Sequence, residues 1–547
     1  MNKNLPGTCV ASSGEFIYGI HKPRFTASNL RKNDHIVTLG HSSDQATTSI
    51  SNTDNFPPNS VHVTDAPWVF EIPNAFPFMG ATFIVKSNAE RMVENGNPFK
   101  REKEYTSDRV LTENFDYVDE ATIERLPHAL LLTLARTSTD PELLTRLAKL
   151  SCRFEYDSRT EMPSGIIYEK TEKGELRPAI LDRHLFELVS NNLFLPDSYK
   201  HQMVLVPGVQ GKSPIVGQYA EGGTHIWEYL RENSYIPWGH YAANMAHDTV
   251  RYKIGSLTER DMVGLRHLYY QRIYVQLATE VGIVTPAKRR SLTRNELEDV
   301  RLCLMDEIER LNKRLGGLPF NATIWGQNFG FDLSPSGYRI NASHQQIHQQ
   351  YALVPSYVPG FKGGENHSSQ AAISTYTQGD LVAQFVKEYK EKTNQYFFET
   401  YLKAIRNNTR LDGRVDKESD LIFYQDENIM AFVPKAQRFQ AEVQIMTKKR
   451  YGNIIETDTK ARDSLDRAIL IAMTVLENLG AEMIGVSEIS KRFDSADRDQ
   501  RLVYCFLPKH PRSPGGFSEY QQRWIISHYP EDFARVCRDE VKNIKKK

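Results

Sequence analysis

Aromatic and helical-period apolar positions mark the expected elements in the first two thirds of the chain. Residues 68–78 are rich in aromatic side chains, which we expect in the core, and contain two prolines, which predicts a strand followed by a turn. Residues 115–200 carry mainly the helical period with charged faces. Residues 293–315 begin with the capping-box pattern of Thr293 and Glu296, which predicts the start of a helix. This part of the chain is therefore expected to combine strands with many helices.

The last third of the chain has a strand-rich pattern. Residues 421–434 predict two strands around a charged turn, and residues 441–446 and 501–508 predict one further strand each. A helix is expected over about 381–405. Residues 459–479 predict a strong amphipathic helix that ends at a glycine. This order of strands and helices indicates an α+β fold.

Two polar stretches interrupt these elements. Residues 33–62 are rich in Ser, Thr, Asp and Asn, which predicts a loop. Residues 356–374 are rich in Gly, Ser and Pro and mark a lobe boundary or an active-site loop. We therefore expect an N-terminal lobe of residues 1–360 and a C-terminal lobe of residues 361–547.

Composition limits the class of protein. The 547 residues exceed one ordinary core, and 40% hydrophobic and 25% charged residues are typical of globular proteins. A formal net charge of +0, from 68 Lys+Arg and 68 Asp+Glu, argues against nucleic-acid binding. Five cysteines without a Cys-x-x-Cys pair indicate a reducing compartment. No apolar run has the length of a membrane helix, and no signal core begins the chain, so we expect a cytoplasmic protein.

Residues 341–350, with the sequence NASHQQIHQQ, carry the most specific chemistry. On a strand, His344, Gln346, His348 and Gln350 share one face. Two imidazoles and two amides suit a phosphate better than a core, because a near-neutral imidazole can attack phosphorus and an amide can hold charged oxygens. On a helix, the two histidines would instead form a metal pair, although no Glu follows the first of them. A surface pair without a function is the other alternative.

A second phosphate-binding hypothesis concerns residues 204–213. An apolar strand leads there into the Gly-Lys-Ser sequence of residues 211–213, as in a phosphate loop. The phosphate-loop motif also requires a glycine five residues before Gly211, but Val206 stands at that position. Pro207 also lacks a backbone amide that could bind the phosphate. We therefore favour a turn between two short strands.

Residues 341–350 resemble the active-site strand of the galactose-1-phosphate uridylyltransferase branch of the histidine-triad (HIT) superfamily. The resemblance implies that His348 is the nucleophile and that Gln350 is the amide two residues after it. Gln346 departs from the pattern, because the family has a histidine there. The resemblance also implies substrate contacts from five residues of this region: Asn328, Gly330, Ser343, His344 and Gln346.

Two more substrate contacts follow from the same resemblance. The strand of residues 68–78 resembles a family strand whose Asn and Asp contact the nucleotide. Asn74 fills the first position, but Ala75 stands where the ribose-binding carboxylate is expected. Glu519 falls on a glutamate that contacts the sugar.

The metal ligands of the family have little counterpart here. Its two iron-binding histidines correspond to Val503 and Cys505, which leaves Glu442 alone at that position. Its zinc site needs the histidine that Gln346 replaces, together with a cysteine pair that this chain lacks. We therefore expect neither a metal of those types nor a cofactor.

The resemblance implies an α+β protein of two divergent HIT-like lobes, each an antiparallel sheet with packed helices, the first enlarged by helical insertions. The implied enzyme is a nucleotidyltransferase of galactose metabolism. It would move a nucleoside monophosphate, UMP by default, between a nucleotide sugar and a sugar phosphate through a nucleotidyl-histidine. Alternatives are a phosphorylase that acts on dinucleoside polyphosphates or nucleotide sugars, and a non-catalytic nucleotide-binding homologue. No nucleic-acid or membrane partner is expected, and a homodimer is compatible with the resemblance.

Overall fold

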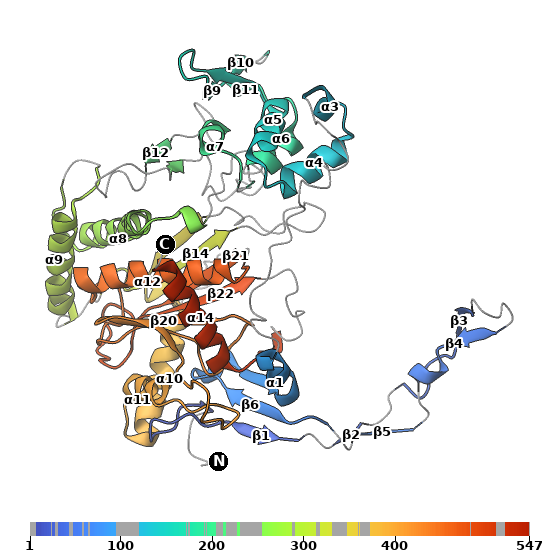
Figure 1. The fold of residues 1–547 in the computed structure, drawn as a ribbon. Helices are drawn as coiled ribbons and strands as arrows, with labels where there is room; N and C mark the ends of the chain where they lie inside the picture. Colours follow the sequence, from blue (N-terminus) through green and yellow to red (C-terminus); the bar gives the residue numbers. More distant parts are fainter. Residues whose placement is uncertain are drawn as a thin grey trace, which may run out of the picture.

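The chain folds into antiparallel sheets with packed helices, an α+β architecture (Figure 1). The computed structural model describes the following residues: 7–22, 25–27, 31–42, 48–56, 59–63, 66–94, 120–170, 172, 176–190, 192, 194–203, 212–214, 227–229, 254–286, 290–312, 318–330, 347–358, 360, 372–481, 483–509 and 520–545. None of the helices among these residues is both long and apolar enough to cross a membrane.

A seven-stranded sheet forms the centre of the molecule, in the order β15-β14-β21-β22-β20-β19-β18. Its strands are β14 (Ala322–Gly330), β15 (Ile347–Val354), β18 (Ile422–Gln425), β19 (Ile429–Phe432), β20 (Val443–Thr447), β21 (Met483–Ile489) and β22 (Val503–Lys509). All six pairings are antiparallel. The strands predicted in the last third are confirmed. The pairing of β14 with β21 joins strands from both sides of residue 360 in one sheet.

Helices cover one face of this sheet. They are α8 (Glu259–Glu280), α9 (Arg294–Asn312), α12 (Thr459–Asn478) and α14 (Pro530–Ile544). Trp325 and Phe329 of β14 belong to the same core as Leu465 of α12. The predicted capping box is confirmed, because the Glu296 amide donates to Oγ1 of Thr293 and the Thr293 amide donates to Oε2 of Glu296.

A second core lies on the other face, over the β19, β20 and β22 part of the sheet. It joins a four-stranded sheet of order β1-β6-β7-β23 to two helices. These elements are β1 (Gly19–His21), β6 (Val69–Pro73), β7 (Ala81–Val85), β23 (Arg523–Ile526), α10 (Gln378–Thr393) and α11 (Phe397–Arg406), and α1 (Lys86–Glu94) follows β7. The single helix expected over 381–405 is two, because Asn394 adopts a left-handed conformation (φ 55°) that ends α10.

The aromatic strand of residues 68–78 is confirmed as β6 and the turn after it, but its side chains differ in burial. Phe70 and Phe76 are buried in the second core. Trp68, which precedes the strand, is 47% exposed, so its expected place in the core is wrong. By alternation Trp68 would share the face of the buried Phe70 and Ile72, but it lies before the first residue of β6 and so outside the packed segment.

Residues 120–203 form a mainly helical unit with a core of its own, as the sequence predicts (Figure 1). It contains α3 (Glu120–Glu124), α4 (His128–Thr137), α5 (Pro141–Ser151), α6 (Arg183–Ser190) and α7 (Asp197–Met203), with β8 (Phe154–Tyr156), β9 (Pro163–Ile166), β10 (Tyr168–Lys170) and β11 (Leu176–Pro178).

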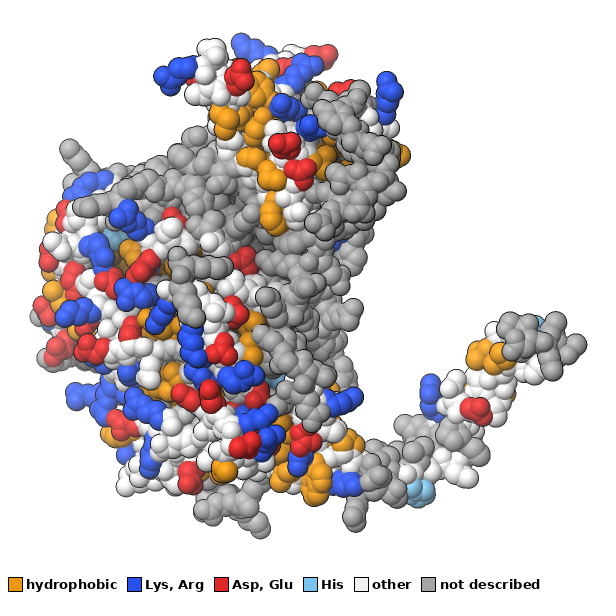
Figure 2. Space-filling view, in the orientation of Figure 1, with side chains coloured by type: hydrophobic (Ala, Val, Ile, Leu, Met, Phe, Trp, Pro, Cys, Tyr) orange, Lys and Arg blue, Asp and Glu red, His pale blue; other side chains and the backbone are white. Residues whose placement is uncertain are grey.

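Short paired strands complete the described structure. They are β2 (Phe25–Ala27), β3 (Thr38–His41), β4 (Ser49–Ser51), β5 (Val61–Val63), β12 (Lys212–Pro214), β13 (Trp227–Tyr229), β16 (Tyr357–Val358) and β17 (Ile373–Ser374). The loop expected over 33–62 therefore contains paired strands, because β3–β4 and β2–β5 form antiparallel pairs. Figure 2 shows acidic and basic side chains interspersed over the viewed face.

Candidate active site

The strand that carries the predicted nucleophile is the edge strand β15. Among the described residues its sheet neighbour is β14 alone, and their register pairs His348 with Asn328 and Gln350 with Gly326. Gly330 ends β14 two residues beyond Asn328. Four of the predicted site residues therefore lie on two adjacent strands.

Alternation along the two strands separates two faces. Trp325 and Phe329 of β14 are buried in the core beneath the helices, so odd-numbered positions of β14 and of its partner β15 face α8 and α12. Positions 328, 348 and 350 therefore belong to the opposite face. On that face Gln350 is exposed and Asn328 is partly exposed, so solvent or a ligand can reach the Gln350 amide.

Several predicted contacts lie outside the described residues. These are Ser343, His344, Gln346 and Glu519, and the 204–211 part of the phosphate-loop candidate. Their roles stay predictions.

Asn74 lies in the turn between β6 and β7, where its amide is bonded within the protein. The side chain is 2% exposed; its Nδ2 donates to the carbonyl of Ala436 (3.1 Å), and its Oδ1 accepts from the amide of Phe76 (3.0 Å). The bond to Ala436 connects the small sheet to the segment before β20, and the bond from Phe76 lies within the turn itself. A nucleotide contact by Asn74 would need its second Nδ2 hydrogen or the release of one of these bonds.

The helix-facing side of β15 is bonded to its surroundings. Oε1 of Gln349 accepts a hydrogen bond from Nε1 of Trp325 (3.0 Å), and Nε2 of Gln349 donates to the carbonyl of Leu265 in α8 (3.4 Å). Two residues further along, the hydroxyl of Tyr351 accepts from Arg272, also in α8 (2.6 Å). The candidate strand is therefore attached to α8 at two points.

Behind Trp325 lies a buried guanidinium. Arg266 of α8 is 0% exposed, and its Cζ lies 4.5 Å from the centroid of the Trp325 ring. Its Nε donates to Oδ1 of Asp466 (3.2 Å), and its Nη2 donates to the hydroxyl of Tyr504 (2.7 Å). Tyr504 in turn donates to Oε2 of Glu488 (2.5 Å). One cation thus links α8, α12, β14, β21 and β22 beneath the candidate site.

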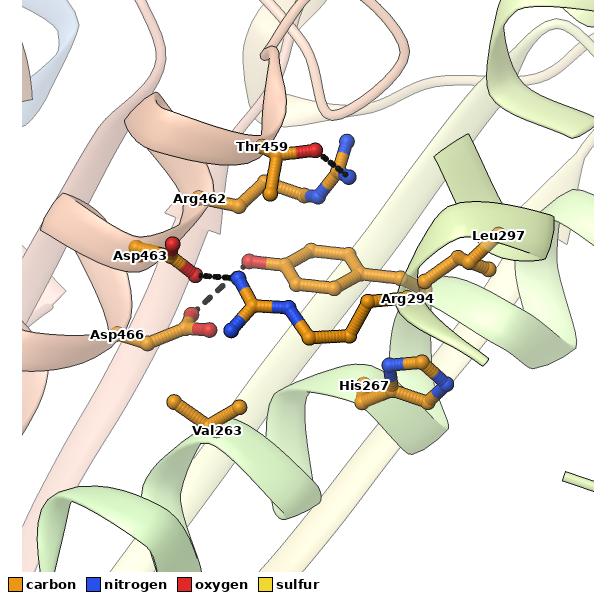
Figure 3. A pocket seen from close by; sticks show the side chains of 9 residues that line it. Val263, His267, Arg294, Leu297, Thr459, Arg462, Asp463 and Asp466 are labelled. Atoms are coloured by element: carbon orange, nitrogen blue, oxygen red, sulfur yellow. Dashed lines mark hydrogen bonds and ion pairs between the residues drawn. The ribbon is translucent and has the colours of Figure 1, made fainter. Parts of the chain in front are cut away.

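Asp466 connects this network to a small pocket between α8, α9 and α12 (Figure 3). Burial raises the pKa of Asp466 to about 7, although the charge of Arg266 opposes that shift. Burial lowers the pKa of His267, which lines the same pocket, to about 4. Figure 3 shows the Asp463 carboxylate held by Arg294 across the pocket.

This network was not predicted from the sequence. Its members lie in different elements, up to 238 positions apart for Arg266 and Tyr504. The sequence did contain one signal, the Arg in a central helix, because a buried Arg almost always has partners. The sequence around Arg266 contains two tyrosines, Tyr269 and Tyr270, that later pack on it, but pairing it with distant carboxylates requires the fold.

The position where the family resemblance places iron holds an ion pair. Glu442 is fully buried. Its Oε1 accepts hydrogen bonds from Nη2 of Arg438 (2.7 Å) and from the side-chain Nε2 of Gln444 (3.0 Å). Val503 and Cys505 are buried in the second core. Within the described residues no group of three or more His, Cys, Asp or Glu side chains could hold a metal ion.

Comparison with known proteins found similarity only among solved structures. No protein-family model and no curated protein match the chain. A GalT-like protein from Arabidopsis thaliana is 13% identical with a TM-score of 0.30, over 45% of this chain and 68% of that one. A uridylyltransferase structure is 14% identical with a TM-score of 0.31, over 46% of this chain and 68% of that one.

Two further similar structures belong to related classes. An ADP-glucose phosphorylase from Arabidopsis thaliana, with bound ADP-glucose, is 14% identical with a TM-score of 0.30, over 45% of this chain and 65% of that one. A histidine-triad nucleotide-binding protein from Sulfolobus tokodaii strain 7 is 16% identical with a TM-score of 0.18, over 23% of this chain and 85% of that one. All of these TM-scores lie below 0.5, so the function proposed below rests on this chain's own residues.

Proposed function

We propose that the protein is a nucleotidyltransferase that works through a covalent nucleotidyl-histidine on His348. The observation that carries this proposal is the pairing of positions 348 and 328 on adjacent strands, with the exposed amide of Gln350 two residues along. An imidazole, a neighbouring carboxamide and a second amide on one open sheet face suit attack on a phosphate ester.

The chemistry runs in two displacement steps. In the first, a neutral imidazole nitrogen of His348 attacks the α-phosphorus of a nucleotide sugar, the P–N bond forms, and the P–O bond to the sugar phosphate breaks. In the second, an oxygen of the acceptor phosphate attacks the same phosphorus, and the P–N bond breaks. Histidine suits this role because its neutral form is abundant near pH 7.

Gln350 stabilises the phosphoryl oxygens and disfavours water as acceptor. Its amide donates to charged oxygens but cannot accept or release a proton near neutral pH. A water molecule is therefore activated poorly, whereas a phosphate acceptor is already an anion. Transfer is favoured over hydrolysis for this reason.

Substrate choice follows the family resemblance. A nucleotide sugar with UMP as the transferred group, a sugar phosphate or inorganic phosphate as acceptor, and contacts from Asn74 and Glu519 make up the proposed substrate set. The proposal includes two divergent HIT-like lobes, one before and one after residue 360. Because Ala75 supplies no carboxylate for the ribose, we expect nucleotide binding weaker by about 1–3 kcal/mol than with an acidic residue there, the scale of one lost hydrogen-bonding partner.

The deciding experiment is capture of the intermediate. Incubation with nucleotide sugars that carry a labelled α-phosphate, UDP-glucose and ADP-glucose first, should produce an acid-labile adduct that peptide mapping assigns to His348. Addition of glucose 1-phosphate or inorganic phosphate should discharge it, and the better acceptor distinguishes transferase from phosphorylase. Absence of an adduct, or discharge by water as fast as by any phosphate, contradicts the proposal.

A further inference from the structure

The edge position of β15 makes its register a weak point. An inner strand is paired on both sides, whereas β15 is paired with β14 alone in the part of the chain that the structure describes. A slip by one residue would move every side chain of the strand to the other face of the sheet. Positions 348 and 350 would then face the helices, and the proposed reaction would have no nucleophile on the open face.

The residue between positions 348 and 350 is fixed by hydrogen bonds of its side chain. Gln349 bonds through both ends of its amide, to Trp325 on the neighbouring strand and to the Leu265 carbonyl on α8. Trp325 is itself 2% exposed and is fixed by the Arg266 guanidinium and by an edge-on contact with Tyr504, whose ring centroid is 5.6 Å away. Trp325 therefore cannot move together with Gln349 if β15 shifts along β14.

We infer that Gln349 is the positioning residue of the candidate site. Its amide, clamped between the Trp325 indole and α8, sets the register of β15 and thereby the face on which His348 and Gln350 lie. The catalytic consequence rests on the proposed function, but the register can be measured without any activity. A slipped strand would place the amide of Gln349 on the open face and leave the indole N–H of Trp325 buried without a partner, which disfavours the slipped state.

A disulfide test measures the register directly. Asn328 and His348 are paired, and opposite residues of an antiparallel pair have the Cα separation that a disulfide requires. In a Cys303→Ser background, which removes the one exposed cysteine, Asn328→Cys with His348→Cys should oxidise readily. Asn328→Cys with Gln350→Cys, in which the second cysteine lies two pairs away along the strand, is the control for non-specific oxidation and should not oxidise readily.

Adding Gln349→Leu to the first pair should slow formation of its disulfide at least about fivefold, because the strand then spends time out of register. An unchanged rate overturns the inference. Failure of the original pair to oxidise also overturns it, because the register itself would then be different.

A second test separates positioning from stability. Single-turnover formation of the His348 adduct should fall about a hundredfold in Gln349→Leu, the scale of a displacement of about 1 Å at a reacting group. Leu353→Ala is the matched control, because Leu353 packs on the main core from the same face of β15 and makes no side-chain hydrogen bond. It should lower the melting temperature as much or more, with less than about a threefold effect on adduct formation.

The double variant Trp325→Phe with Gln349→Leu removes the donor and the acceptor of the indole bond together, so no indole N–H is left buried without a partner. Its melting temperature should recover relative to Gln349→Leu, while adduct formation stays low. Recovery of both would reduce Gln349 to a stabilising residue and overturn the inference. If the unmodified protein forms no adduct at all, the proposed function fails, and the disulfide rates still decide the register.

Discussion

At the scale of single residues, His348 and its neighbours differ in what each can contribute. His348 lies on a strand whose register is defined, with Asn328 opposite it. His344 lies four positions earlier, outside the described residues. Because only His348 has a glutamine two residues later that matches the family ending, we expect His348 to be the nucleophile and His344 to be a phosphate donor at most.

Replacing His348 by Asn should lower turnover by at least about a thousandfold, the scale for loss of a covalent catalyst. His344→Asn should cost about 1–3 kcal/mol in transition-state binding, as for one lost charged hydrogen bond. Steady-state kcat/KM of the two purified variants gives both numbers. Equal losses would indicate a metal-binding pair instead, and full activity of the His348 variant would exclude this site.

The buried guanidinium of Arg266 is a second residue-scale determinant, in this case of stability. Arg266→Met should destabilise the protein by about 3–5 kcal/mol, because it leaves the buried carboxylates of Asp466 and Glu488 without their cation. Arg290→Met is the matched control. Its ion pair with Glu296 has side chains that are 44% and 34% exposed, so solvent screens the pair and the loss should be far smaller. Denaturant unfolding measures both, and similar losses would contradict the assignment.

At the scale of elements, a carboxylate of α9 binds an arginine of α12. Glu298 of α9 accepts hydrogen bonds from Arg301 (2.6 Å) and from Arg462 of α12 (2.7 Å). Burial alone raises the pKa of this carboxyl, but the hydrogen bonds from the two arginines outweigh burial and lower the pKa to about 2. The helix contact therefore prefers the charged carboxylate.

This pKa predicts how stability depends on pH. A carboxyl whose folded-state pKa is below its unfolded value binds fewer protons when folded, so its contribution is present above pH 4.5 and is lost as the pH falls towards 2. Glu298→Gln should therefore flatten the decline in unfolding free energy between pH 5 and pH 3. Urea titrations of both proteins at the two pH values test this. An equally steep decline in the variant would show that other carboxyls cause it.

At the scale of the whole molecule, separate cores predict separate unfolding. The helical unit of residues 120–203 has its own core, whereas the main sheet joins strands from residue 322 to residue 509. Contacts between the parts of one sheet make it unfold as a unit, whereas a unit with a separate core can unfold independently.

Two matched variants test this arrangement. Leu147 in the helical unit and Leu465 in α12 are both fully buried helix residues, so each Leu→Ala change should cost about 2–5 kcal/mol. In calorimetry or hydrogen exchange, Leu147→Ala should shift only the transition of the helical unit, and Leu465→Ala only that of the main sheet. A single transition that both variants shift would contradict independent unfolding.

Local pattern was enough to predict several of the elements. Capping at Thr293, the strands of residues 421–434, 441–446 and 501–508 and the helix before Gly480 depend on hydrogen bonds and apolar periods within a few residues. The central strand β21 was not predicted, and two other expectations were wrong. The exposure of Trp68 and the division of 381–405 into α10 and α11 were both missed.

The sequence by itself determined which residues can act as nucleophile and as amide donor, and it predicted that they lie on a strand. Only the tertiary structure decided which strand lies beside β15, that strands from both sides of residue 360 share one sheet, and that Arg266 supports Trp325 from behind. The physical reason is the separation along the chain over which each effect acts. Side-chain periodicity and capping act over a few residues, whereas strand order and burial of a charge result from contacts between residues that are up to two hundred or more positions apart.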